Sequence, residues 1–218
     1  LDALAASRVE TAYAAVSPHT PRTRGRLVER RSGDGTEPKP ESLELVVVDT
    51  PGDGYVADLR AALAEGPTAP TLTLAVDLPL LDEAAVDAVL DAHAAEAADA
   101  LSVRVPAARK RELGASADAA TRYRGARDGE SADAGDETSV DRVPAGVNVV
   151  GAIDGAGDEA VRATRDGRLA VNVNRPEDRR LAERILAGDR DAPALPSGGV
   201  DWLDADDAGA TSEGGEPP

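Results

Sequence analysis

Apolar residues along this chain occur in short continuous runs, and the stretches between the runs have helical periodicity. Leu45–Val48 is continuously apolar, and so is Leu72–Val76 apart from Thr73, as expected for strands that are covered on both faces. Runs of this kind that alternate with helices are typical of βαβ units, so we predict an α/β fold, a three-layer αβα sandwich with a mostly parallel sheet. The predicted strands are Ala12–Val16, Leu43–Asp49, Thr71–Asp77, Ala100–Val105, Val147–Gly151 and Leu169–Val173.

Three segments between these runs carry apolar residues at the spacing of one helix face. Asp82 stands where a side chain would cap the first of them, and Asn174 and Glu177 are spaced like a capping box before another. The predicted helices are Asp82–Ala95, Glu177–Ala187 and Tyr55–Ala64.

The composition changes near residue 188 and divides the chain in two. Residues 1–187 contain all the predicted elements, whereas 188–218 consist mainly of Asp, Ala, Gly, Ser and Pro. We therefore expect a single domain over 1–187 and a disordered acidic tail over 188–218, whose deletion would cost little. Gly114–Asp141, polar and rich in Gly, is expected to be a flexible excursion around a short strand at Arg122–Arg124.

The charge of the chain argues against nucleic acid as a partner. Asp and Glu number 41 against 24 Lys and Arg, which gives a net charge of -17 and disfavours nucleic acid as a ligand. Our hypothesis is a surface adapted to molar salt in a halophile, because salt screens self-repulsion; full folding at about 50 mM salt, measured by circular dichroism, would contradict it.

The same composition bears on the compartment. No run approaches the ~20 apolar residues of a membrane span, and no signal peptide opens the chain. The absence of cysteine excludes disulfides and thiolate metal sites. We expect a soluble cytoplasmic protein, with no membrane partner.

Candidate chemistry lies where the predicted strands end, since open α/β sheets bind ligands beyond the carboxyl ends of their strands. Asp77 ends the run Thr71–Val76 and could hold a hard cation through oxygen, or it could cap the turn that follows. Gly52 and Gly54 would let backbone approach a phosphate, or they form an ordinary glycine-rich turn.

Two asparagine side chains each have two possible roles. Asn148 follows Gly146 inside an apolar run, where a polar side chain is costly unless it is hydrogen-bonded, so it binds either substrate or neighbouring backbone. Asn174 could ligate a metal through its amide oxygen, although the N-cap of a helix is the commoner use of such a residue.

In their order along the chain, four segments resemble the nucleotidyltransferases with a MobA-like, Rossmann-like fold. The resemblance is strongest to the archaeal GTP:adenosylcobinamide-phosphate guanylyltransferases. The segments are Thr50–Leu59, Val76–Leu78, Val143–Val150 and Val171–Asn174.

This resemblance implies transfer of GMP from GTP to adenosylcobinamide phosphate with Mg²⁺, and it leaves a homodimer open. By the same resemblance, Asp77 is catalytic and holds the metal, with Asn174 as the second metal ligand. The residues implied to border the guanine and ribose are Ser17, Gly52 and Gly54. Those implied to face the nucleotide or the corrinoid phosphate are Gly146 and Asn148.

The chain departs from this family at its start. The family opens with a strand and a loop of the pattern G-G-x-G-T-R followed by Lys-Pro, whereas this sequence enters at the first helix. We expect a truncated chain that lacks the first strand and phosphate loop and is weak or inactive in catalysis. The alternatives are a molybdenum-cofactor guanylyltransferase, a sugar-phosphate nucleotidyltransferase, and a non-catalytic binding domain that has lost its loop.

Overall fold

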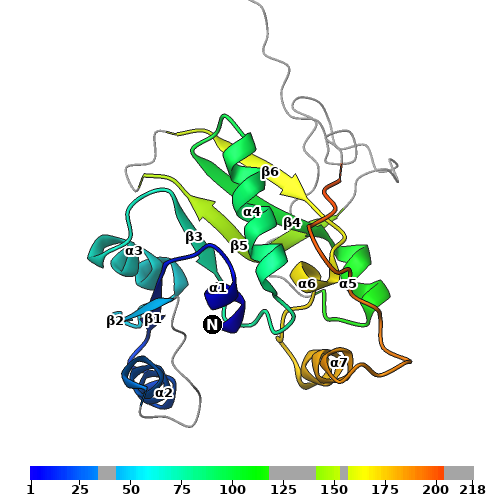
Figure 1. Ribbon diagram of the computed structural model, residues 1–218, viewed down its shortest axis with the longest axis horizontal. Coiled ribbons are helices and arrows are strands. Elements are labelled where there is room, and N and C mark those ends of the chain that lie inside the picture. The colour runs from blue at the N-terminus through cyan, green and yellow to red at the C-terminus, as the bar shows by residue number, and fades with distance from the viewer. Residues whose placement is uncertain (34–42, 118–140, 153–156, 204–218) are drawn as a thin grey trace, which may run out of the picture.

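Six strands form two separate sheets in the computed structural model, which describes residues 1–33, 43–117, 141–152 and 157–203 (Figure 1). β1 (Thr11–Val16) and β2 (Glu44–Asp49) pair in parallel. The other four strands form a sheet in the order β3-β5-β4-β6. These strands are β3 (Thr71–Leu74), β4 (Ala100–Pro106), β5 (Arg142–Val150) and β6 (Glu159–Ala163).

The strand directions confirm the α/β class and the mostly parallel sheet. β5 runs antiparallel to β3 and to β4, while β6 runs parallel to β4, so three of the four strands point the same way. β5 starts at Arg142 and is longer than the predicted Val147–Gly151. Along it, Val143, Ala145 and Val147 are buried and alternate with less buried residues, which is the pattern of a strand with one face on the core.

Helices cover both sheets. α4 (Glu83–Ala95) lies across one face of the four-stranded sheet, and the Asp82 side chain caps it by accepting the Ala85 N–H at 2.8 Å, as predicted (Figure 1). α2 (Pro21–Ser32) and α3 (Tyr55–Glu65) lie on either side of β1 and β2, which gives a layered arrangement (Figure 1).

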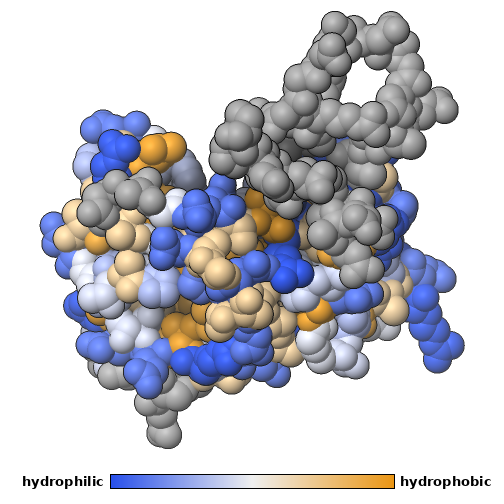
Figure 2. Space-filling model, turned by 90° about the horizontal axis from the view of Figure 1, so that it is seen from above, coloured by the Kyte–Doolittle hydropathy of each residue, from blue (hydrophilic) through white to orange (hydrophobic). Residues whose placement is uncertain are grey.

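The core is made of small apolar side chains. It lies between α4 and the sheet, where Val89, Leu101, Val103 and Val147 are fully buried. Figure 2 shows apolar residues on the surface in patches between hydrophilic ones. Among the described helices, none is long and apolar enough to cross a membrane.

The predicted strand Leu169–Val173 is wrong. Its first residues belong to the short helix α6 (Gly167–Ala170), and Val171 follows in extended conformation. The side chain of Asp166 starts this helix by accepting the N–H of Arg168 at 2.9 Å. The apolar run reflects complete burial in the core, which a short helix and a strand can both provide.

The start of the last helix, α7 (Pro176–Leu186), also differs from the prediction. Arg175 occupies the N-cap position in place of Asn174. The carboxylate of Asp178, and not that of Glu177, accepts the backbone N–H groups of Asn174 and Arg175, at 3.1 and 2.9 Å. The capping interaction therefore exists, but it is shifted by one residue.

Residues 188–203 are not a free tail, which corrects the expected domain boundary. Thr164 forms an isolated antiparallel β-bridge with Trp202 and donates its hydroxyl to the backbone oxygen of Asp201 at 2.7 Å. Leu195, Val200 and Trp202 pack against the core. The sequence hides this docking because three apolar residues are scattered among polar ones. The remainder of the predicted tail, 204–218, and the strand predicted at Arg122–Arg124 lie outside the described residues.

Removing the docked segment should therefore cost stability. A chain ending at Gly188 is expected to unfold at a midpoint several degrees below that of a chain ending at Leu203, because three large apolar side chains lose partial burial and full burial of one contributes about 1.5–3 kcal/mol. Thermal unfolding of both chains in the same buffer checks this. Equal midpoints would mean that the packing of Leu195, Val200 and Trp202 adds nothing.

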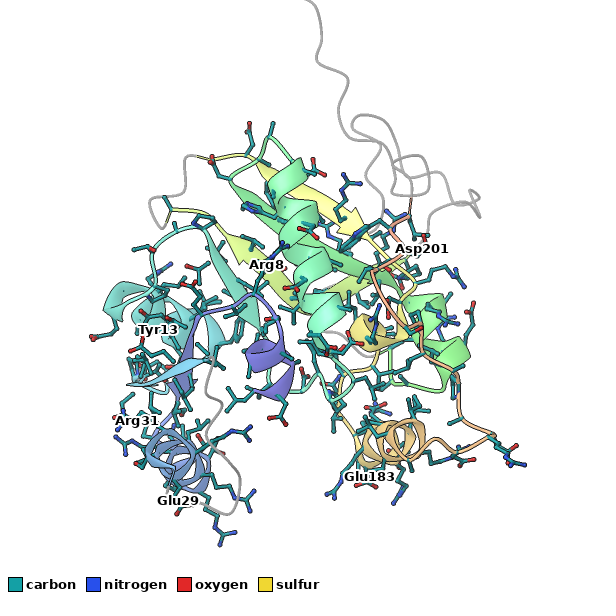
Figure 3. All side chains as sticks on the ribbon, in the orientation of Figure 1. Arg8, Tyr13, Glu29, Arg31, Glu183 and Asp201 are labelled. Carbon is teal, nitrogen blue, oxygen red and sulfur yellow. The ribbon has the colours of Figure 1, made fainter. Side chains whose placement is uncertain are left out.

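Each sheet has edge strands that pair on one side only. β1 pairs only with β2, and β3 pairs only with β5, among the strands that the structure describes. The helix before β1, α1 (Asp2–Ala6), packs against α4 and so connects the two sheets. Arg8 follows it and bonds the carboxylates of Asp87 and Asp91 on α4 (Figure 3).

Candidate functional site

Asp77 lies in a turn three residues beyond the carboxyl end of β3, which ends at Leu74 and is shorter than the predicted strand Thr71–Asp77. The buried side chains of Leu78 and Leu80 anchor the turn that follows it. Its backbone oxygen accepts the N–H of Val173 at 2.9 Å, which ties the turn to the segment after α6. The carboxylate is half-exposed, so it can meet both protein groups and a ligand.

The residue that contacts the Asp77 carboxylate is Asn172, which the sequence analysis had not selected. Its Nδ2 donates to Asp77 Oδ1 and to the backbone oxygen of Ala145, both at 3.3 Å. Asn172 is only 7% exposed, whereas Asn174 is exposed and bonds Asp178 through its backbone N–H. A role for Asn174 as a metal ligand stays a prediction.

Gly146 brings β5 close to these residues. Its φ of 82° is in the left-handed region, and a Cβ there would lie 3.0 Å from the Ala75 Cβ and 3.3 Å from Asn172 Nδ2. The Ala75 N–H donates to the Gly146 oxygen at 2.8 Å. Only glycine fits both the conformation and the space without strain.

Asn148 lies two residues further along β5, on the same face as Gly146. Its strand neighbours are Thr73 and Ser102, and its backbone oxygen accepts the Thr73 hydroxyl at 3.3 Å. Because β5 is antiparallel and this face is half-buried, the side chain does not need the partner that a fully buried parallel strand would require. Its binding role stays a prediction.

Lys110, on α5 (Ala107–Leu113), completes the cluster and was missed by sequence reasoning. Its ammonium Nζ donates to Asn172 Oδ1 at 2.6 Å, and the side chain is 3% exposed. Burial lowers the pKa of Lys110, and the carboxylates of Asp77 and Asp178 act in the opposite direction. A signal existed, since the chain contains only two lysines and one of them lies in a short basic stretch after an apolar strand.

The residues predicted to border the guanine and ribose form a second group, at the ends of β1 and β2. We call Ser17, Gly52 and Gly54 the nucleotide-side residues. At Gly52, φ is 81°, and a Cβ would lie 2.9 Å from Pro18 Cδ and 3.0 Å from the Ser17 hydroxyl oxygen. The Gly52 N–H donates to Asp58 Oδ1 at 2.7 Å. Gly54, with φ of 107°, precedes α3. Within the described ranges, no hydrogen bond joins this group to Asp77.

The residues around Asp77 suit magnesium better than zinc. The described part of the chain has no cluster of three His, Asp or Glu side chains that could hold a metal. Magnesium needs no such cluster, because it keeps several waters and takes one or two carboxylates together with substrate phosphates. Among the described residues, Asp77 Oδ2 has no hydrogen-bond partner, which leaves one carboxylate oxygen for a cation.

Asp178 is a fully buried carboxylate that holds this region together. Its two oxygens accept the N–H and hydroxyl of Ser116, both at 2.7 Å, and the N–H groups of Asn174 and Arg175. Burial alone would raise the pKa of Asp178, but these hydrogen bonds outweigh it and hold the pKa below its ordinary value. Asp178 thereby joins the segment after α5 to the start of α7.

The stabilisation from Asp178 should be lost in acid. Because the folded pKa is depressed, the carboxylate contributes fully above its unfolded pKa of about 3.9 and progressively less as pH falls below it. Asp178→Asn is expected to lower the free energy of unfolding by about 1.5–3 kcal/mol near neutral pH, and by less near pH 3. Urea unfolding at both pH values measures this, with the exposed Glu177→Gln as control. A loss that does not shrink in acid would contradict the assignment.

A comparison with known protein families identifies the family of the chain. Residues 2–142 match the MobA-like NTP transferase domain, a region that includes Asp77 and Lys110 and ends before Gly146. The search of curated proteins found no match. The matched region covers more than half of the 218 residues. The chain therefore belongs to the MobA-like NTP transferase family, whose members are nucleotidyltransferases.

Proposed function

We propose that this protein transfers GMP from GTP to adenosylcobinamide phosphate, giving adenosylcobinamide-GDP and pyrophosphate in cobalamin biosynthesis. Family membership supports nucleotidyl transfer, and the resemblance of Val143–Val150 and Val171–Asn174 to the cobinamide enzymes supports the acceptor. One observation supports the proposal most strongly. Three motifs far apart in the sequence meet at one point, where Asn172 contacts both Asp77 and the backbone beside Gly146.

In the proposed reaction, an oxygen of the acceptor phosphate attacks the α-phosphorus of GTP, and the bond to the bridging oxygen breaks to release pyrophosphate. Bound Mg²⁺ would neutralise charge on the phosphates. Asp77 would hold the ion through its open carboxylate oxygen, with Asn174 as the second ligand. Positioning and electrostatic stabilisation together account for most of the catalysis in phosphoryl transfer.

The glycines give the substrates close access to the backbone. We propose that Ser17, Gly52 and Gly54 border the guanine and ribose, where both glycines have positive φ. Gly146 and Asn148, on one face of β5, would face the nucleotide or the corrinoid phosphate. The net charge of -17 supports the further proposal that the enzyme works in molar salt.

A non-catalytic binding domain is the second candidate. The division of the strands into two sheets favours it, because the nucleotide-side residues and the Asp77 cluster share no hydrogen bond within the described ranges. Such a domain would bind GTP without transferring GMP to any acceptor.

The deciding experiment follows GMP transfer from α-labelled GTP in molar KCl with Mg²⁺. Adenosylcobinamide phosphate, molybdopterin and a sugar 1-phosphate are offered as acceptors, and CTP and UTP replace GTP in parallel reactions. The expected result is labelled product only with GTP and adenosylcobinamide phosphate, at a higher rate from a chain extended upstream to include the phosphate loop than from this chain. Transfer to another acceptor would reassign the enzyme within its family, and GTP binding without transfer would favour the binding domain.

A further inference from the structure

We infer that Lys110 is a positioning residue: it fixes the orientation of the Asn172 side-chain amide and, through it, the carboxylate of Asp77. The inference rests on the proposed role of Asp77 in holding Mg²⁺. It concerns a side chain to which neither the sequence motifs nor the proposed reaction gives a role.

The burial of Lys110 calls for an explanation. An ammonium group loses much of its hydration at 3% exposure, and this costs several kcal/mol unless partners compensate. The short hydrogen bond from Nζ to Asn172 Oδ1, 2.6 Å, is the direct compensation. The carboxylates of Asp77 and Asp178 add attraction at longer range. The lysine is therefore held at the cluster by groups that belong to the site and its support.

The chemistry of the two side chains decides how the amide points. A lysine ammonium has donors and no acceptor, so the atom of Asn172 that faces it must be the amide oxygen. The amide nitrogen then faces the other way, toward Asp77 Oδ1 and the Ala145 oxygen, both of which are acceptors. Without the ammonium, Asn172 Oδ1 loses its partner, and the amide is held only by the two longer bonds from Nδ2. The Asn172 side chain would then be less firmly fixed, and with it the Asp77 carboxylate that it contacts.

The backbone around Lys110 holds the lysine in place. α5 ends at Gly114 in left-handed conformation, and the N–H of Ala115 closes the last turn on the Lys110 oxygen at 2.9 Å. Ser116 then bonds Asp178, which anchors the start of α7. The backbone that carries Lys110 is thus fixed, and its side chain acts on Asp77 from a constant position. Partners that orient a metal-ligating group typically change metal affinity or activity by about 10- to 100-fold when they are removed.

The first test measures Mn²⁺ binding by electron paramagnetic resonance, in molar KCl that screens weak binding to surface carboxylates. The Asp77→Asn protein defines which part of the binding belongs to Asp77. Lys110→Met is expected to weaken that part by about tenfold or more, while Lys110→Arg, a cation that also only donates, restores most of it. Arg111→Met, an exposed neighbour on α5, is the matched control and should bind as the unmodified protein does.

The second test keeps the native side chains, so it does not depend on whether Lys110→Met folds. Protein labelled with ¹³C at lysine Cε gives two signals, from Lys39 and Lys110, and Lys110→Arg identifies them. Mn²⁺ at Asp77 is expected to broaden the Lys110 signal, and Asp77→Asn to abolish the broadening.

The outcomes separate the two proposals. Loss of Mn²⁺ binding in Asp77→Asn together with unchanged binding in a folded Lys110→Met would overturn the role of Lys110 alone. A Lys110 signal that stays sharp, while Asp77→Asn does remove binding, overturns it as well. Mn²⁺ binding that is the same in Asp77→Asn and in the unmodified protein would instead remove the metal site of the proposed function.

Discussion

In a chain extended upstream to include the phosphate loop, replacing Asp77 with Asn is expected to reduce nucleotidyl transfer by about 10²- to 10⁴-fold, because metal stabilisation of transition-state charge supplies several kcal/mol and each 1.36 kcal/mol is a factor of ten. The amide has no negative charge to hold Mg²⁺ beside the phosphates. The fold should persist, since the backbone oxygen of residue 77 still accepts the Val173 N–H and an amide oxygen can still accept from Asn172.

The measurement is the rate of GMP transfer against Mg²⁺ concentration, with the thermal midpoint recorded for each protein. Glu83→Gln, which removes an exposed carboxylate from the first turn of α4, serves as the control for a loss of one negative charge. A rate equal to that of the unmodified protein at every Mg²⁺ concentration would exclude Asp77 from the reaction.

The largest loss of stability is expected from Arg168→Met, about 3–5 kcal/mol, because removing one partner of a buried ion pair leaves an uncompensated charge. Arg168 is 1% exposed, and its guanidinium donates to the carboxylates of Asp166 and Asp82. It also donates to the backbone oxygens of Gly198 and Gly199, at 2.8 and 3.0 Å. One side chain thus joins α6, the cap of α4 and the docked segment 188–203.

For a domain of this size, such a loss lowers the thermal midpoint by about 6–20 °C. Arg165→Met is the matched control, because its ion pair with Glu112 is half-exposed and such pairs contribute about 0–1 kcal/mol. The double variant Arg168→Met, Asp166→Asn should recover part of the loss, since the amide leaves no uncompensated charge at residue 166. Equal midpoints for Arg168→Met and Arg165→Met would contradict the assignment.

Several elements could be predicted from the sequence because their apolar pattern is set by burial. The strands β1 to β4 lie where the apolar runs are, and Asp82 caps α4 as its position indicated. The pattern fails for α2, Pro21–Ser32, which has no buried residue and therefore no apolar stripe to read. It fails differently at Leu169, where complete burial produces an apolar run without specifying helix or strand.

The candidate site could be predicted in part for a related reason. Asp77 and Gly146 are marked by their place at a strand end and by the glycine itself. Asn172 and Asn174 are only two residues apart, and which one turns inward depends on α6, which the sequence did not predict. The rarity of lysine marks Lys110 but does not indicate its role, because its partners Asn172 and Asp77 are distant in the sequence and meet it only after folding.

The division into two sheets determines which part of the molecule can unfold locally. The N–H and C=O groups on the free edges of β1 and β3 lack strand partners within the described ranges, so each sheet is a separate hydrogen-bonded unit. The bonds from Arg8 to Asp87 and Asp91, both partly exposed, lie at the contact between α1 and α4. Exposed ion pairs are weakened by salt, whereas apolar packing is not. Raising the ionic strength therefore weakens the contact between α1 and α4 first. The sheet of β1 and β2 can then exchange its amide hydrogens as a cooperative unit while the hydrogen bonds of the larger sheet stay intact.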